Sequence, residues 1–306
     1  MEFQKVPTGL DIPPQEKVKT LETFSDYQVR YTSAHSGGGC IRKIDKDSYF
    51  DIRTGEVSQF KHSDSREDDI KNVQKTLRNL RNTINYNVSD VSRCRWLTLT
   101  YAENMRDTQK LKDDFKNFNT RARNTFGRYE YIAIAEPQGR GAWHWHAILI
   151  FADTAPFMEN SDVYRCWKQG YVTVRKLDNI DNVGAYLSAY LTNMEVDEAK
   201  SLGIDFSPSD IKEVEFTDDD GNKVSKRVVK GSRLYLYPSG FNIYRRSKGI
   251  KTPKYEEVTR QEADRKISEN GMKLYSSSAY RITDSDSGFR FAVQNERYKK
   301  VSTCDL

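Results

Sequence analysis

The feature that most restricts the fold of this chain is an apolar segment, residues 143–151, that carries two histidines one residue apart. In a β-strand the side chains at positions i and i+2 point to the same face. His144 and His146 are therefore expected to lie side by side, with Trp143 and Trp145 on the other face. The spacing predicts a strand that presents two imidazole donors on one face of a sheet.

Two aligned imidazoles need a third ligand to hold a catalytic metal and still leave coordination positions open. Residues 129–136 have the pattern of a preceding strand, and residues 138–141 that of a turn returning the chain antiparallel. Glu136, at the end of that strand, is the candidate third ligand. The alternative is a surface or hydrogen-bonded histidine pair without a metal, which is the more common role of this spacing taken alone.

Two other segments extend the pattern. Upstream, residues 95–101 form a short β-prone stretch with a Thr-Leu-Thr sequence, and downstream, residues 182–193 carry Tyr186 and Tyr190, four positions apart. Together with the histidine strand, in this order, they resemble the three motifs of the HUH endonucleases, specifically the rolling-circle replication initiators of plasmids and small single-stranded DNA phages. The resemblance covers roughly residues 95 to 195 and extends to neither end of the chain.

The resemblance implies a reaction and its participants. Tyr186 and Tyr190 would be the nucleophiles, and a Mn²⁺ or Mg²⁺ ion held by Glu136, His144 and His146 would polarise the scissile phosphate. The products would be a 5′-phosphotyrosine link and a free 3′-hydroxyl on single-stranded origin DNA, which a host polymerase extends with a host helicase. The chain departs from the family at two positions, Ala189 and Asn193, where lysines are usual, so the group that neutralises the phosphate stays open.

The order of expected elements predicts an α+β fold, with an antiparallel sheet and helices packed on one side. The resemblance implies the same architecture, a ferredoxin-like or RRM-like sheet with the metal on its open face. The expected elements are strand 96–101, helix 108–126, strands 129–136 and 143–151, helix 161–168, strand 170–176 and helix 180–193.

Three consecutive parts are expected. Residues 1–90 hold strands and an amphipathic helix that ends near residue 85, preceded by a proline-containing stretch, residues 1–25, expected to be a loose arm. Residues 91–255 hold the catalytic domain and a basic segment. Residues 256–306 form a C-terminal extension without an interpretable motif.

The basic segment alternates cations with aromatic residues between positions 223 and 255 and contains no Asp or Glu. Cations attract phosphates and rings stack on unpaired bases, so this composition favours contact with single-stranded DNA. The alternative is a hairpin with a solvated basic face and aromatic residues that belong to the core. The candidate DNA-binding residues are Arg233, Tyr235, Tyr237, Arg245, Arg246 and Lys248.

Composition sets broad limits. A net charge of +5 permits a polyanionic partner, and four widely spaced cysteines argue against a disulfide frame or a zinc ribbon. No apolar run is long enough for a membrane span, so a cytoplasmic protein of a bacterial host is expected. The alternatives to a replication initiator are a relaxase or single-strand transposase, and a non-catalytic nucleic-acid-binding protein on an RRM-like sheet.

Overall fold

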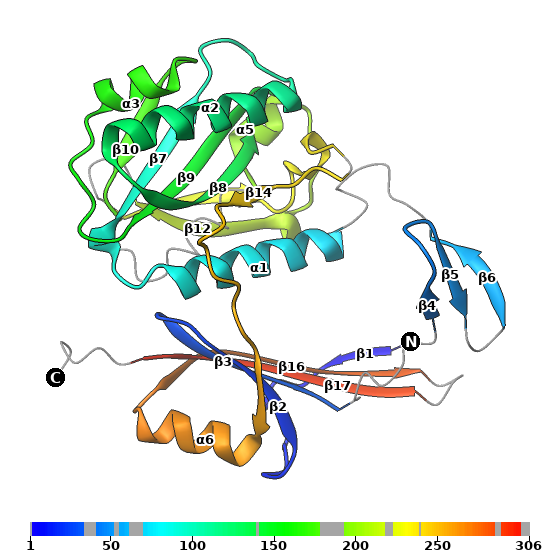
Figure 1. The fold of residues 1–306 in the computed structure, drawn as a ribbon. Helices are drawn as coiled ribbons and strands as arrows, with labels where there is room; N and C mark the ends of the chain where they lie inside the picture. The colour runs from blue at the N-terminus through cyan, green and yellow to red at the C-terminus, as the bar shows by residue number, and fades with distance from the viewer. Residues whose placement is uncertain are drawn as a thin grey trace. The chain divides into compact units, whose positions relative to one another are not determined.

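The computed structural model divides the chain into two compact units, residues 1–62 with 253–306, and residues 63–252. Every strand pair among the described residues is antiparallel, and helices accompany the sheets, which confirms the α+β fold (Figure 1). The structure describes residues 2–33, 41–51, 55–60, 70–138, 141–177, 193–217, 223–238, 240–284 and 289–300.

The central element of the unit 63–252 is a five-stranded sheet in the order β10-β7-β9-β8-β14. Its first four strands and two helices follow one another as β-α-β-β-α-β, the ferredoxin-like arrangement that was expected. The elements are β7 (Cys94–Thr100), α2 (Thr108–Phe126), β8 (Tyr129–Pro137), β9 (Trp143–Phe151), α3 (Asn160–Trp167), β10 (Val172–Arg175) and β14 (Tyr244–Arg246), after the short 3-10 turn η1 (Val91–Arg93).

Helix α2 covers the face of the sheet that carries the tryptophans of β9. It begins where the Asp107 side chain accepts hydrogen bonds from two free backbone N–H groups, and it ends at Gly127, which has a φ of 87°. Its apolar stripe is buried, and Trp145 donates a hydrogen bond to the carbonyl of Leu111. The indole nitrogen is thereby satisfied inside the core.

Helix α1 (Ile70–Asn87) lies on the opposite face of the same sheet (Figure 1). Its buried residues Val73, Leu80 and Ile84 belong to the same core cluster as the sheet. The expectation of helices on one side was therefore too simple, because an amphipathic helix assigned to the N-terminal part packs on the second face. That face has buried isoleucines along β8 and β9, and the two histidines lie nearer the start of β9.

A second, three-stranded sheet in this unit has the order β11-β13-β12. The loop between β12 and β13, where a hairpin turn was expected, lies outside the described residues, but Thr217 and Lys223 pair on either side of it. The elements are β11 (Met194–Glu195), α5 (Val196–Ser201), η2 (Pro208–Asp210), β12 (Ile211–Thr217), β13 (Lys223–Val229) and η3 (Leu234–Leu236).

The other unit is built from both ends of the chain. A six-stranded sheet has the order β1-β16-β17-β3-β2-β15, and helix α6 (Arg260–Glu269) packs on it through Ala263. Its strands are β1 (Glu2–Lys5), β2 (Lys17–Glu22), β3 (Asp26–Thr32), β15 (Glu256–Thr259), β16 (Lys273–Asp284) and β17 (Phe289–Lys299), and a small separate sheet holds β4 (Ile41–Lys43), β5 (Ser48–Asp51) and β6 (Glu56–Gln59).

The expectation of a loose arm over residues 1–25 was wrong. Two segments of it are strands because their partners come from elsewhere in the chain: β1 pairs with β16, and β2 pairs with β3 and β15. Among the described residues, no helix combines the length and the apolar character that crossing a membrane requires.

Candidate metal centre

The β8–β9 hairpin brings the three predicted ligand residues together. Glu136 pairs directly with His144 in the antiparallel register, and His146 lies two residues further along the same face. The Nε2 atom of His146 is 2.6 Å from Glu136 Oε2, and the Nε2 atom of His144 is 3.1 Å from the same oxygen. One potential ligand atom from each residue lies within 4.8 Å of the other two.

The strand next to β9 orients one imidazole. Thr98 of β7 pairs with His146 in the sheet, and its Oγ1 lies 3.2 Å from His146 Nδ1. The Trp96 ring stacks on the same imidazole, with 5.1 Å between centroids. A hydroxyl can donate or accept, so Thr98 can hold the tautomer that leaves Nε2 available to a metal.

Burial sets the protonation state of this histidine. Removal from solvent lowers the pKa of His146 well below its usual value, and the positive charges of His144 and Arg175 lower it further. Neutral imidazole is the form that binds metals. His146 is therefore in its ligand form at neutral pH without having to lose a proton.

A buried arginine holds the other oxygen of the carboxylate. Arg233 forms an ion pair with Glu136 Oε1, and its second terminal nitrogen lies 2.9 Å from Glu198 Oε2 on α5. Only 5% of the Glu136 side chain and 14% of the Arg233 side chain are exposed. The two carboxylate oxygens of Glu136 thus have different partners: Oε1 faces a guanidinium, and Oε2 faces the two imidazoles.

This donor set fits a divalent metal ion. Two imidazoles and one carboxylate oxygen converge from neighbouring strands, and three protein ligands leave positions for water or substrate. The cluster is partly exposed at the histidines, whose side chains are 12% and 14% accessible. A substrate phosphate could therefore reach an ion bound there.

The six candidate DNA-binding residues are not one continuous surface. Tyr237 is buried, its ring packs edge-on against Trp143, and its hydroxyl donates to the carbonyl of Ala135. A base cannot stack on it in this conformation, so that part of the expectation needs correction, because a core position and an exposed one look alike in an aromatic-rich segment. Arg233 is likewise drawn into the metal centre rather than to the surface.

The other four candidates remain accessible. Tyr235 is exposed, two residues from Arg233. Arg245 and Arg246 lie on the edge strand β14, where the Arg246 guanidinium donates to Thr252 Oγ1, and Lys248 follows in an exposed turn. Tyr186 and Tyr190, the expected nucleophiles, lie outside the described residues.

Three contributors to the site were missed from sequence. Thr98 had a detectable signal, since it lies at the i, i+2 spacing within the Thr-Leu-Thr strand. Arg233 was selected for its charge but assigned to DNA, and Glu198 carried no signal because its partner is 35 residues away in the chain.

Comparison with known proteins supplies one match. A family model for the replication-associated protein ORF2 matches residues 94–195, one third of the chain. The matched part begins at β7 and contains all three candidate ligands, so this third of the chain is similar to a replication-associated protein family, as a replication initiator would be. No curated protein and no solved structure matched the chain.

Proposed function

We propose that this protein is a rolling-circle replication initiator, an HUH endonuclease that nicks and rejoins single-stranded origin DNA. The observation that carries the proposal is the Glu136, His144 and His146 cluster, which lies inside the segment that matches a replication-associated family. Neither half would suffice alone, because clusters of this kind also occur as hydrogen-bonded groups and family similarity does not identify a reaction.

The proposed metal is Mn²⁺ or Mg²⁺, although two imidazoles and a carboxylate bind Zn²⁺ more tightly by intrinsic affinity and cellular supply decides which ion is used. When bound, the ion would supply positive charge to a nonbridging oxygen of the scissile phosphate. Thr98 and Arg233 orient the ligands: Thr98 fixes the His146 ring, and Arg233 holds Glu136 so that Oε2 faces the imidazoles.

The proposed nucleophiles are Tyr186 and Tyr190. The phenolic oxygen attacks phosphorus and loses its proton, the bond to the 3′ oxygen breaks, and that oxygen leaves as a 3′-hydroxyl. The 5′-phosphotyrosine conserves the energy of the broken bond, so rejoining requires no nucleotide hydrolysis. Two tyrosines four residues apart on a helix would lie close enough to act in turn.

The proposed setting is the cytoplasm of a bacterium that carries a plasmid or phage replicon, where host polymerase and helicase extend the 3′ end. Tyr235, Arg245, Arg246 and Lys248 are proposed to contact the single strand, because they are the accessible members of the basic segment. Phosphate contacts of this kind make binding fall steeply with salt.

The test is formation of a covalent adduct. Full-length protein incubated with replicon single-stranded DNA and Mn²⁺ should give an SDS-resistant protein–DNA band, which EDTA prevents, and peptide mapping should locate the DNA on Tyr186 or Tyr190. His144→Ala and His146→Ala should lose most of the adduct, whereas His62→Ala serves as a matched control. Adduct that survives in the double Tyr→Phe variant would refute the nucleophile assignment, and full adduct in both histidine variants would refute the metal centre.

A further inference from the structure

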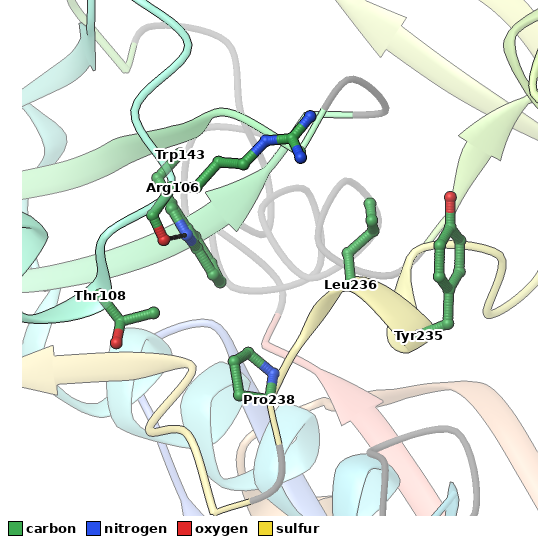
Figure 2. A pocket seen from close by; sticks show the side chains of 7 residues that line it. Arg106, Thr108, Trp143, Tyr235, Leu236 and Pro238 are labelled. Atoms are coloured by element: carbon green, nitrogen blue, oxygen red, sulfur yellow. Dashed lines mark hydrogen bonds between the residues drawn. The ribbon is translucent and has the colours of Figure 1, made fainter.

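A pocket beside the metal centre has walls of mixed chemistry. It has a volume of about 350 Å³, within the range of small-molecule sites. Figure 2 shows Arg106 and Trp143 facing the segment that carries Tyr235, Leu236 and Pro238. The lining residues are Arg106, Thr108, Gly141, Trp143, Tyr235, Leu236 and Pro238.

Both chain segments that build the metal centre also build this pocket. Trp143 lines the pocket and is followed directly by the candidate ligand His144. Tyr235 lines it and comes two residues after Arg233, which pairs with Glu136. The pocket and the metal centre are therefore coupled through two separate stretches of covalent structure.

The floor of the pocket is rigid. The Trp143 indole donates to the carbonyl of Arg106, its backbone N–H donates to Met105, and its ring stacks on Phe241 with centroids 4.8 Å apart. Tyr237 packs on the same indole and is anchored to Ala135 by its hydroxyl. A planar group that enters the pocket thus meets a fixed aromatic and aliphatic surface.

The rim offers one ring and one cation. Tyr235 is 44% exposed, so its ring has a face open to a ligand. The Arg106 guanidinium lies against Gly141, where a built Cβ atom would be 3.2 Å from Nε and where φ is +82°. Glycine at this position lets the cation lie close to the backbone at the mouth of the pocket.

We propose that this pocket binds one unstacked nucleobase of the single strand, with its ring on Tyr235 and the adjoining phosphate at Arg106. The inference rests on the proposed function for the identity of the strand, and it adds a base-binding subsite to it. An aromatic face with apolar walls suits any base, and a guanidinium at the rim suits the phosphate that follows it.

The experiment compares two oligomers of equal charge with full-length protein in EDTA, so that cleavage plays no part. One is fluorescein-labelled dT20, and the other is a 20-mer of abasic spacers with the same phosphates. Tyr235→Ala should weaken dT20 binding by roughly five- to 150-fold, the range for loss of one base stack, and leave the abasic oligomer within about twofold. Tyr235→Phe should bind like the wild type.

Two further variants separate stacking from charge. Arg106→Gln should weaken both oligomers and lower the log-log salt slope by about 0.7 for one phosphate. Tyr171→Ala is the matched control, since Tyr171 is 74% exposed in the same unit but does not line the pocket. It should leave both affinities unchanged.

Each contrary result has a definite meaning. Unchanged dT20 binding by Tyr235→Ala, equal weakening of both oligomers, or the same loss in Tyr171→Ala would overturn the subsite. Complete displacement of dT20 by millimolar dTMP, with no effect of chain length, would assign the pocket to a free nucleotide and overturn the strand assignment. Absence of metal-dependent cleavage by the wild type would count against the proposed function and leave the pocket result intact.

Discussion

Two buried arginines in this protein each join two carboxylates, one in each unit. Arg233 bridges Glu136 and Glu198, and Arg260 bridges Glu296 and Asp264. The arginine side chains are similarly buried, with 14% and 16% exposed. The two clusters therefore share charge, burial and connectivity.

They differ in what faces the buried carboxylate. Glu296 accepts hydrogen bonds from Gln294 and from the Tyr298 hydroxyl, groups that satisfy its oxygens and hold no metal. Glu136 instead faces two imidazole nitrogens, and among the described residues its cluster has the donors that could hold an ion. A buried arginine–carboxylate pair is thus structural or functional according to the partners of the second oxygen.

The largest expected effect separates the two glutamates. Glu136→Gln removes an anionic ligand, and we expect it to lower metal-dependent DNA cleavage by more than about a hundredfold, above the range for outer partners of a metal ligand. Glu296→Gln, the matched change in the other cluster, should leave cleavage within about twofold, because no proposed reactant contacts it. Single-turnover cleavage of replicon DNA at saturating protein measures both, and a comparable loss in the two variants would erase the distinction.

The arginines should differ in their response to metal. Breaking a buried ion pair by removing one partner costs about 3–5 kcal/mol, so Arg233→Met and Arg260→Met should both lower the free energy of unfolding by that amount in EDTA. Added Mn²⁺ should restore part of the loss in Arg233→Met only, because the dication can replace the guanidinium beside Glu136. Urea denaturation with and without Mn²⁺ measures this, and equal recovery in both variants would contradict the role of Glu136.

The smallest expected effect is a pH dependence confined to the metal centre. The folded-state pKa of His146 is lowered by burial, so between that value and 6.5 the unfolded chain binds more protons and stability falls as pH falls. The loss should reach about 1.4 kcal/mol at pH 5.5 relative to neutral pH. Urea unfolding in EDTA at pH 7.5 and 5.5 measures it. His146→Asn should lose this component, and an identical pH slope in the variant would show that other groups cause it.

Much of the unit 63–252 could be predicted because its signals are local. The alternation in Trp143 to Phe151 predicted β9 with the bounds that it has, and the short turn before it placed Glu136 beside His144. The stripe of α2 predicted that helix in the same way. Each of these depends on neighbours within a few residues, where periodicity is informative.

The rest depended on pairings between distant residues. Glu198 and Arg233 meet across a loop, and a 3-10 turn decides that Tyr235 is exposed while Tyr237 is buried. β1 and β2 look like a polar arm because the partners that make them strands lie near the other end of the chain. Composition carries no information about such partners.

The pairing of β3 with β17 also orders events during synthesis. β3 ends at Thr32 and β17 begins at Phe289, so 257 residues (289 − 32) separate the two strands. At about 5–20 residues per second, a ribosome would need roughly 13 to 50 s to supply the missing partner. Residues 63–252 emerge complete within that interval. We therefore expect the unit that holds the histidines to fold on the ribosome first, while the nascent N-terminal hairpin keeps an open hydrogen-bonding edge until the last strands are made.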